Sequence, residues 1–203
     1  MTIVKVCGLQ EIEHVKAAVD ARVDWIGFVF APSRREITVE QAQLLAQYIP
    51  PEVKKVGVFV NASPHFIKEV YEKVPLDFIQ YHGDETNDFI AQIGLPAIKA
   101  FAIRSAEDVK NAFTYDVDYY LLDAPGLDYR GGSGHTFDWS LLKDFKNKKF
   151  LLAGGLNPEN VQKAVETVCP FGVDVSSGVE IDKRKNTALI QRFIQNAKGV
   201  NIL

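Results

Sequence analysis

The chain has 203 residues, of which 47% are hydrophobic and 24% charged, a composition typical of soluble globular domains and unlike that of disordered proteins. Its 23 basic and 26 acidic side chains give a net charge of -3, which leaves no basic field for nucleic acid or an acidic membrane surface. No apolar run approaches the roughly 20 residues that cross a bilayer, and the first residues lack the order of a secretory signal. Two cysteines, Cys7 and Cys169, cannot build a disulfide framework, so we expect free thiols and a cytoplasmic protein.

Eight short runs rich in β-branched, aliphatic and aromatic residues are predicted to be strands. Several are apolar at almost every position, such as 26–30 and 56–60. This composition is typical of strands that bury both faces in a parallel sheet covered by helices. In chain order the predicted strands are 3–7, 25–30, 55–60, 78–81, 97–101, 119–123, 150–153 and 172–175.

Helical spacing of apolar residues occupies the segments between the strands, with weaker patterns after the fourth and sixth. Ser63-Pro64 predicts a helix start, with serine as the N-cap and proline in the first turn, and Asn157-Pro158 repeats that pattern. Ser105 stands three residues before Asp108, which is the spacing of a capping box. The segment 187–198 carries apolar residues along one face and is predicted to be the last helix.

Strands and helices alternate strictly, with roughly 25 residues for each strand–helix unit, which suits a minimal closed barrel. The alternative is an open doubly wound sheet, which usually has fewer strands and a GxGxxG fingerprint after the first. This chain has Cys7-Gly8-Leu9-Gln10 at that place. We therefore predict an α/β protein in which residues 1–203 form one single-domain (β/α)8 TIM barrel.

Two late loops have the composition of an anion site. In such a barrel the active site lies at the carboxyl ends of the strands, and the loops after strands seven and eight recurrently bind phosphate. Gly154-Gly155 follows the seventh predicted strand and Ser176-Ser177-Gly178 the eighth. Glycine allows close approach of backbone amides, and a short helix starting at Ser176 or Ser177 would direct unpaired N–H groups at an anion. Tight turns with a serine cap are the alternative for each loop, but the two together favour a phosphate site.

Two strand ends carry residues suited to proton transfer. Alternation along the first strand places Lys5 and Cys7 on one face and the valines between them on the other, so Lys5 and Cys7 are predicted to point into the barrel mouth. A nearby ammonium stabilises a thiolate, which could act as a base, although a lone cysteine at a strand end is usually a buried packing residue. Asp123 ends the sixth strand and is either a turn cap or a catalytic carboxyl.

Other polar residues at the predicted mouth are less specific. Arg35, on the loop after the second strand, is either solvated or positioned to bind a carboxylate with its guanidinium fork. The glycine-rich segment 129–135 lacks the flanks of a P-loop and is interpreted as a flexible lid, with a plain surface loop as the alternative. Of the four histidines only His82 ends a strand. No ligand spacing typical of a metal site is present, so we predict neither a metal nor a cofactor.

Short motifs along nearly the whole chain occur in one order and spacing. They are KVCG at 5–8, GFVF at 27–30, SRREI at 33–37, VGVFVN at 56–61, QYHG at 80–83, LLD at 121–123, GGSG at 131–134 with FDW at 137–139, GGLNP at 154–158, and DVSSGVE at 174–180. Together these motifs resemble one family, the phosphoribosylanthranilate isomerases of tryptophan biosynthesis. Tyr81 departs from the family pattern, which usually has leucine there.

The resemblance implies an Amadori rearrangement without a cofactor, in which N-(5-phosphoribosyl)anthranilate becomes 1-(2-carboxyphenylamino)-1-deoxyribulose 5-phosphate. It implies that Cys7 is the general base, that Asp123 is the general acid, and that Arg35 meets the anthranilate carboxylate. The glycine and serine loops would hold the phosphate. The expected substrate-binding residues are Arg35, Lys5, His82, Gly155, Asp174, Ser177 and Gly178.

Rival interpretations make different demands on the same positions. The two-substrate histidine/tryptophan sugar isomerases resemble this fold, but they have an aspartate at the first-strand base position and a second phosphate loop after strand three. This chain has Cys7 and Val60-Asn61-Ala62 there. A pentulose-phosphate 3-epimerase would need metal-binding histidines and aspartates. A non-catalytic phosphometabolite-binding barrel would not need both Cys7 and Asp123. We expect a small phosphorylated molecule as the partner, and a monomer and a homodimer both remain open.

Overall fold

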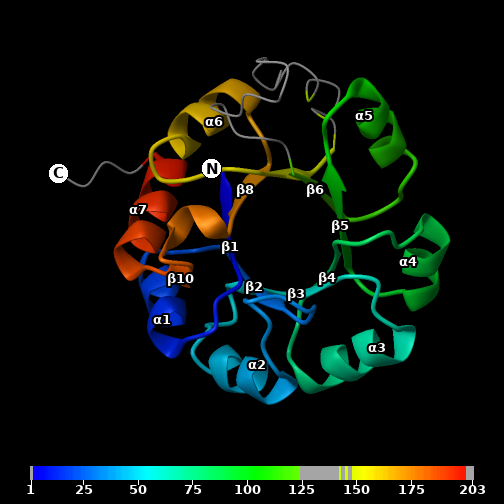
Figure 1. Cartoon of the computed structure of the whole chain (residues 1–203), viewed down its shortest axis with the longest axis horizontal. Coiled ribbons are helices and arrows are strands. Elements are labelled where there is room, and N and C mark those ends of the chain that lie inside the picture. The colour runs from blue at the N-terminus through cyan, green and yellow to red at the C-terminus, as the bar shows by residue number, and fades with distance from the viewer. Residues whose placement is uncertain (1, 124–141, 143–144, 146–147, 200–203) are drawn as a thin grey trace.

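The computed structural model describes residues 2–123, 142, 145 and 148–199, and shows a ring of parallel strands with helices outside it (Figure 1). Each strand pairs with the next and β8 pairs with β1, so the barrel is closed. The predicted (β/α)8 barrel is confirmed, and the open sheet is excluded. All eight predicted strands are present, with bounds that differ from the prediction by at most one residue: β1 Ile3–Cys7, β2 Trp25–Val29, β3 Lys54–Phe59, β4 Phe78–Tyr81, β5 Ala97–Ala102, β6 Tyr119–Asp123, β7 Phe150–Ala153 and β8 Gly172–Val175.

Helices cover the outer surface of the ring. None of the described helices has the length and apolar character needed to cross a membrane. The helix expected after β6 falls outside the described residues. Those that are described are α1 Ile12–Asp20, α2 Val39–Ala46, α3 Pro64–Lys73, α4 Asn87–Ile93, α5 Ala106–Phe113, α6 Val161–Val168 and α7 Thr187–Lys198.

The predicted caps are confirmed at two helices and wrong at a third. The Ser63 side chain accepts the backbone N–H of Phe66, and Ser105 forms a capping box at the start of α5. In contrast, α6 begins only at Val161, four residues after Asn157. The Asn157 side chain accepts the backbone N–H of Glu159 at 2.9 Å, so Asn157-Pro158 forms a turn ahead of the helix and not its cap.

Aromatic residues fill the barrel interior at the amino ends of the even-numbered strands. Trp25 stacks on Phe78 with ring centroids 5.1 Å apart and meets the edge of Tyr119 at 4.9 Å. Phe171, just before β8, packs against Tyr119 at 5.3 Å. Alternate strands supply such layers in barrels of this kind. The interior is therefore packed at this end, and the pocket described below opens at the other.

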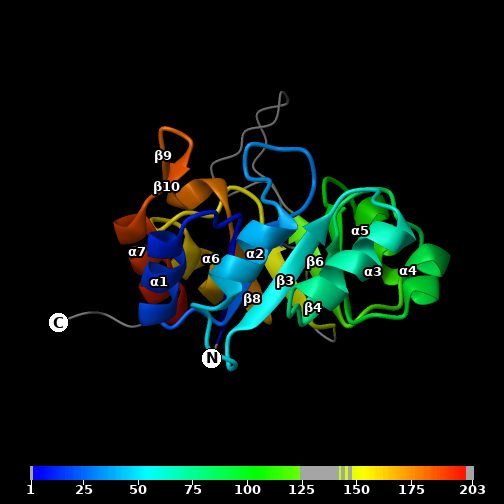
Figure 2. The same ribbon diagram turned by 90° about the horizontal axis from the view of Figure 1, so that it is seen from below.

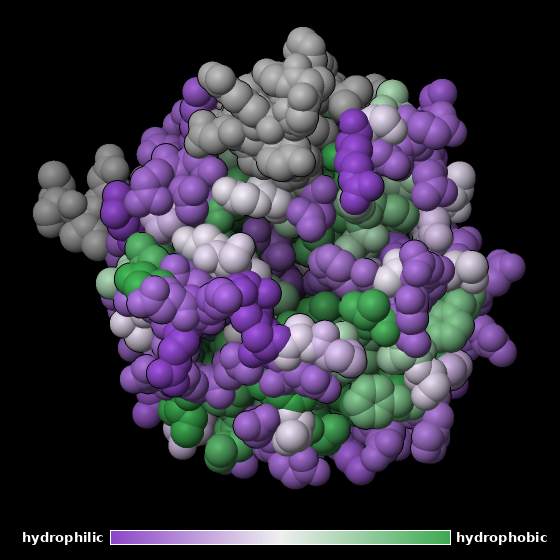
Figure 3. Space-filling model, in the orientation of Figure 1, coloured by the Kyte–Doolittle hydropathy of each residue, from purple (hydrophilic) through white to green (hydrophobic). Residues whose placement is uncertain are grey.

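A short antiparallel hairpin stands at the carboxyl end of the barrel. Its strands, β9 Glu180–Ile181 and β10 Arg184–Lys185, lie between β8 and α7 in the chain. The hairpin rises on the same side of the barrel as the loop after β2 (Figure 2). The space-filling view of this face shows a hollow over the barrel centre with hydrophilic side chains gathered around it (Figure 3).

Candidate active site

A pocket of about 350 Å³ opens at the carboxyl ends of the strands. It brings together side chains and loops from β1, β2, β4, β6, β7 and β8, which are far apart in the chain. Of the residues expected to act or to bind substrate, all but Lys5 line it. They are Cys7, Arg35, His82, Asp123, Gly155, Asp174, Ser177 and Gly178.

Lys5 lies beneath the pocket instead of lining it. Its ammonium is fully buried and donates to Oδ1 of Asp174 on β8 at 2.8 Å. Lys5 and Cys7 point to the same side, over Gly27 of β2. A Cβ at Gly27 would lie only 2.8 Å from Cys7 Sγ and 3.2 Å from Lys5 Nζ. The predicted inward alternation of β1 is therefore confirmed, and the glycine on the next strand provides the space for the thiol.

Burial dominates the electrostatics of this pocket. It raises the pKa of the Cys7 thiol, although Lys5 opposes this effect. Burial also raises the pKa of Asp123, against the opposing effect of His82. Burial alone would lower the pKa of Lys5, but Asp174 and Cys7 raise it above its usual value. Lys5 therefore remains charged, while Asp123 retains its proton to a higher pH than an exposed aspartate.

His82 and a residue that sequence reasoning missed, Gln80, form a pair on β4 and the loop after it. The side-chain amide of Gln80 lies 2.9 Å from Nδ1 of His82. Burial lowers the pKa of His82, which favours the neutral ring. Gln80 is 1% exposed and lines the pocket, and its Oε1 has no hydrogen-bond partner among the described residues. Inward alternation of β4 with His82 was the signal in the sequence that could have identified Gln80.

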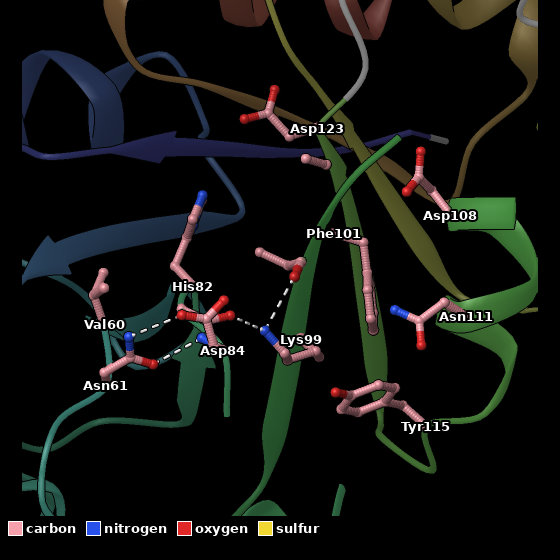
Figure 4. A pocket seen from close by; sticks show the side chains of 13 residues that line it. Val60, Asn61, His82, Asp84, Lys99, Phe101, Asp108, Asn111, Tyr115 and Asp123 are labelled. Carbon is pink, nitrogen blue, oxygen red and sulfur yellow. Dashed lines mark hydrogen bonds between the residues drawn. The ribbon is translucent and has the colours of Figure 1, made fainter. Parts of the chain in front are cut away.

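A second pocket of about 570 Å³ lies at the ends of β3, β4 and β5 (Figure 4). His82 and Asp123 line both pockets, so the two adjoin. In it the buried Lys99 donates to the carbonyl oxygen of Gly83 at 2.7 Å. Asn61 and Asp84 bind each other across its rim, with the Asp84 N–H donating to Asn61 Oδ1 at 2.7 Å (Figure 4). These bonds hold the loops after β3 and β4 together beside His82.

The loops after β7 and β8 interlock. Residues Ser177–Val179 form a single 3₁₀ turn, where the sequence predicted a short helix from Ser176 or Ser177. Gly178 packs against the Leu156 carbonyl oxygen so closely that no Cβ fits between them. Gly155 lines the same part of the pocket with a left-handed backbone at φ 62°. The two loops therefore pack against each other and line the pocket together.

Arg35 lies on the loop after β2, and in the closed barrel only β1 stands between β2 and β8. Its guanidinium pairs with Glu180 of the β9–β10 hairpin, with Nε 2.7 Å from Oε1. Sequence reasoning did not identify Glu180 as part of the site, although it stands in the motif that follows β8.

Two segments that the sequence analysis singled out lie outside the described residues. They are the glycine-rich segment 129–135, interpreted as a lid, and the motif at 137–139. Within the described part of the chain, one group of side chains has the spacing for a metal ion, namely Glu11, Glu13 and His14, and none of the three lines the pocket.

Fold and pocket together define a single-domain (β/α)8 barrel in which ionisable side chains from several strand ends line one pocket. Residues 4–196 match the family described as PRAI, N-(5'-phosphoribosyl)anthranilate (PRA) isomerase. The isomerase of Listeria monocytogenes serotype 4b is 48% identical over 200 residues, which cover 98% of this chain and 99% of the relative.

Solved structures of phosphoribosylanthranilate isomerases are also similar to this chain. A phosphoribosylanthranilate isomerase in complex with reduced 1-(o-carboxyphenylamino)-1-deoxyribulose 5-phosphate is 39% identical, with a TM-score of 0.88 and coverage of 98% of this chain and 100% of the other. A monomeric form of the dimeric Thermotoga maritima isomerase is 38% identical, with a TM-score of 0.87 and the same coverage. The chain therefore belongs to the phosphoribosylanthranilate isomerase family. It is the isomerase of tryptophan biosynthesis that converts N-(5-phosphoribosyl)anthranilate to 1-(2-carboxyphenylamino)-1-deoxyribulose 5-phosphate.

Proposed function

We propose that Asp123 and Cys7 carry out this isomerisation as general acid and general base. The observation that carries the proposal is that Asp123, from β6, and Cys7, from β1, line one pocket although they are far apart in the chain. Burial raises the pKa of Asp123, which favours the protonated form that a general acid needs. We assign removal of the proton from the sugar carbon to Cys7, whose thiolate can act as a base.

The first step opens the sugar ring. Asp123 donates its proton to the ring oxygen as the C1′–oxygen bond breaks, and the anthranilate nitrogen lone pair forms the C1′=N bond. The product of this step is an iminium ion with a free 4′-hydroxyl, and Asp123 becomes a carboxylate. Burial raises the pKa of Asp123 and so favours the neutral acid that this step requires.

The second step moves the double bond. The Cys7 thiolate takes the proton from C2′, and the electron pair forms a C1′=C2′ bond and neutralises the nitrogen. The enolamine then gains a proton at C1′ and loses its hydroxyl proton, which leaves the ketone. Burial alone disfavours the thiolate, but the ammonium of Lys5 and the iminium charge of the opened substrate both favour it.

The remaining side chains bind the two ends of the substrate. We assign the phosphate to the backbone amides of Gly155, Ser177 and Gly178, and the anthranilate carboxylate to Arg35. Oε1 of Gln80, which has no hydrogen-bond partner among the described residues, can accept a ribose hydroxyl, and His82 lines the pocket together with Asp123.

The state of assembly and the compartment complete the proposal. The binding partner that we propose for this chain is its phosphorylated small-molecule substrate. A homodimer is the oligomeric state to test first, because the Thermotoga maritima relative is dimeric. We place the protein in the cytoplasm, because a thiol that acts as a base must stay reduced. Sedimentation analysis of the purified chain distinguishes monomer from dimer.

The test is turnover of enzymatically generated phosphoribosylanthranilate, followed by the loss of its fluorescence. Cys7→Ala and Asp123→Asn are each expected to lower kcat by about two to four orders of magnitude, the usual contribution of a general acid or base. Cys169→Ala, which removes an exposed thiol, is the matched control and should keep full activity. Near-native kcat in Cys7→Ala would overturn the assignment of the base.

A further inference from the structure

Glu180 is a buried carboxylate that the catalytic steps above do not use. Its side chain is 5% exposed, and three cations surround it. Nε of Arg35 lies 2.7 Å from Oε1, Nζ of Lys185 lies 2.9 Å from the same oxygen, and Nη2 of Arg34 lies 2.5 Å from Oε2. Burial would raise the pKa of Glu180, but the bonds from Arg35 and Lys185 lower it to about 2. The carboxylate is therefore charged at neutral pH.

Glu180 occupies one particular edge of the Arg35 guanidinium. It accepts Nε at 2.7 Å and Nη2 at 3.1 Å, which leaves the edge formed by Nη1 and the second hydrogen of Nη2. Among the described residues no hydrogen bond involves Nη1. The side-chain carbons of Arg35 lie across Gly8, where a Cβ would come within 2.6 Å of Cδ. Arg35 is thus held from two sides, and it lines the pocket that contains Cys7.

Lys185 holds Glu180 in place. Its ammonium is buried and donates to the carbonyl oxygen of Ser176 at 2.7 Å as well as to Glu180. Ser176 in turn donates its hydroxyl to the carbonyl oxygen of Cys7 at 3.1 Å. The hairpin is therefore tied to the ends of β8 and β1, and β1 ends at the proposed base, Cys7.

We propose that Glu180 is a positioning residue, which holds the guanidinium of Arg35 so that its free edge faces the substrate carboxylate. The proposal rests on the assignment of that carboxylate to Arg35. In the opposite role, Glu180 would compete with the substrate carboxylate for Arg35 and would have to move away when substrate binds. The buried ammonium of Lys185 would then lose its carboxylate partner, which is costly. A preorganised guanidinium loses less freedom when it binds, so Glu180 should strengthen carboxylate binding.

The experiment compares two probes by calorimetry. One is the reduced product analogue, 1-(o-carboxyphenylamino)-1-deoxyribulose 5-phosphate after reduction; the other is its counterpart made from aniline, which lacks the carboxylate. Glu180→Gln should weaken the first probe by about tenfold or more and the second by less than about threefold, since one charge-assisted contact is at stake. If Glu180→Gln does not fold, Glu180→Asp keeps the charge beside Lys185 but is too short to span both Arg35 nitrogens, and it should show the same selective loss.

Two further variants complete the test. Glu180→Gln combined with Arg35→Ala should bind the carboxylate probe no more weakly than Arg35→Ala alone, because Glu180 acts through the arginine. Arg184→Ala removes an exposed ion pair with Glu11 from the same hairpin and should bind both probes like the wild type.

The outcomes separate the two proposals. Equal weakening of both probes by Glu180→Gln, or losses that add in the double variant, would overturn the positioning role. Wild-type binding by Glu180→Gln together with a large loss in Arg35→Ala would also overturn it, and would leave the role of Arg35 intact. If Arg35→Ala bound both probes like the wild type, the assignment of the carboxylate to Arg35 would itself fail.

Discussion

The substitution Gly27→Ala tests the proposed base by displacing the Cys7 thiol and not by replacing it. A methyl group at Gly27 would lie 2.8 Å from Cys7 Sγ and 3.2 Å from Cys7 Cα, whereas carbon-sized atoms normally stay about 3.5–4.0 Å apart. The thiol must therefore move by about 1 Å. A displacement of that size at a reacting group costs about 100-fold in rate, or about 2.7 kcal/mol of activation free energy. We expect kcat to fall by that factor, while KM changes little because the phosphate and carboxylate contacts lie elsewhere.

Gly57→Ala is the matched control for this substitution. Its methyl group would meet Leu76 Cδ1 at 2.6 Å and Phe59 Cε2 at 2.9 Å, away from the thiol. Both variants should lose stability, since overpacking costs about 1–3 kcal/mol, and thermal melting measures that loss. Only in Gly27→Ala should kcat fall by about 100-fold, as measured by the loss of substrate fluorescence. Equal kcat values in the two variants would refute the reasoning that the position of the Cys7 thiol limits the reaction.

Three further predictions follow from the site. Gly178→Ala should raise the inhibition constant of inorganic phosphate by about tenfold or more, because its methyl group would collide with the Leu156 carbonyl oxygen and separate the two phosphate loops; an unchanged constant would place the anion elsewhere. Iodoacetamide should inactivate the enzyme through Cys7, faster as the pH rises, because burial raises the pKa of the thiol, while alkylation of the exposed Cys169 should leave activity intact. Activity should survive EDTA, because the proposed steps use side-chain acid and base alone, and recovery of lost activity by added zinc would contradict that mechanism.

Local patterns in the sequence were sufficient for the elements and for most of the pocket. A strand buried on both faces is apolar throughout, so β2 and β3 were recognisable without any partner. Once the strands are known, the rule that barrel sites lie at their carboxyl ends selects Cys7, His82 and Asp123 as candidates. These residues do line one pocket, because closure of the barrel brings consecutive strand ends together.

The prediction at Asn157 failed for a local reason. An asparagine followed by proline satisfies the composition of both a helix cap and a turn, and the side chain of Asn157 accepts backbone N–H groups in the turn. The helix starts only at Val161. Composition alone does not distinguish these two geometries.

The amino-acid sequence by itself determined the order of strands and helices, the closed barrel and the loops at its mouth, because these follow from periodicity and turn chemistry within a few residues. Only the tertiary structure decided how charges pair across the chain. Lys5 binds Asp174, which lies 169 residues further along the chain, and Arg35 binds Glu180, which lies 145 residues further along. Neither partner can be predicted from the spacing of residues in the sequence. The tertiary structure also decided that burial raises the pKa of Cys7 despite the ammonium two residues away, because the cost of removing a charge from water depends on everything packed around it.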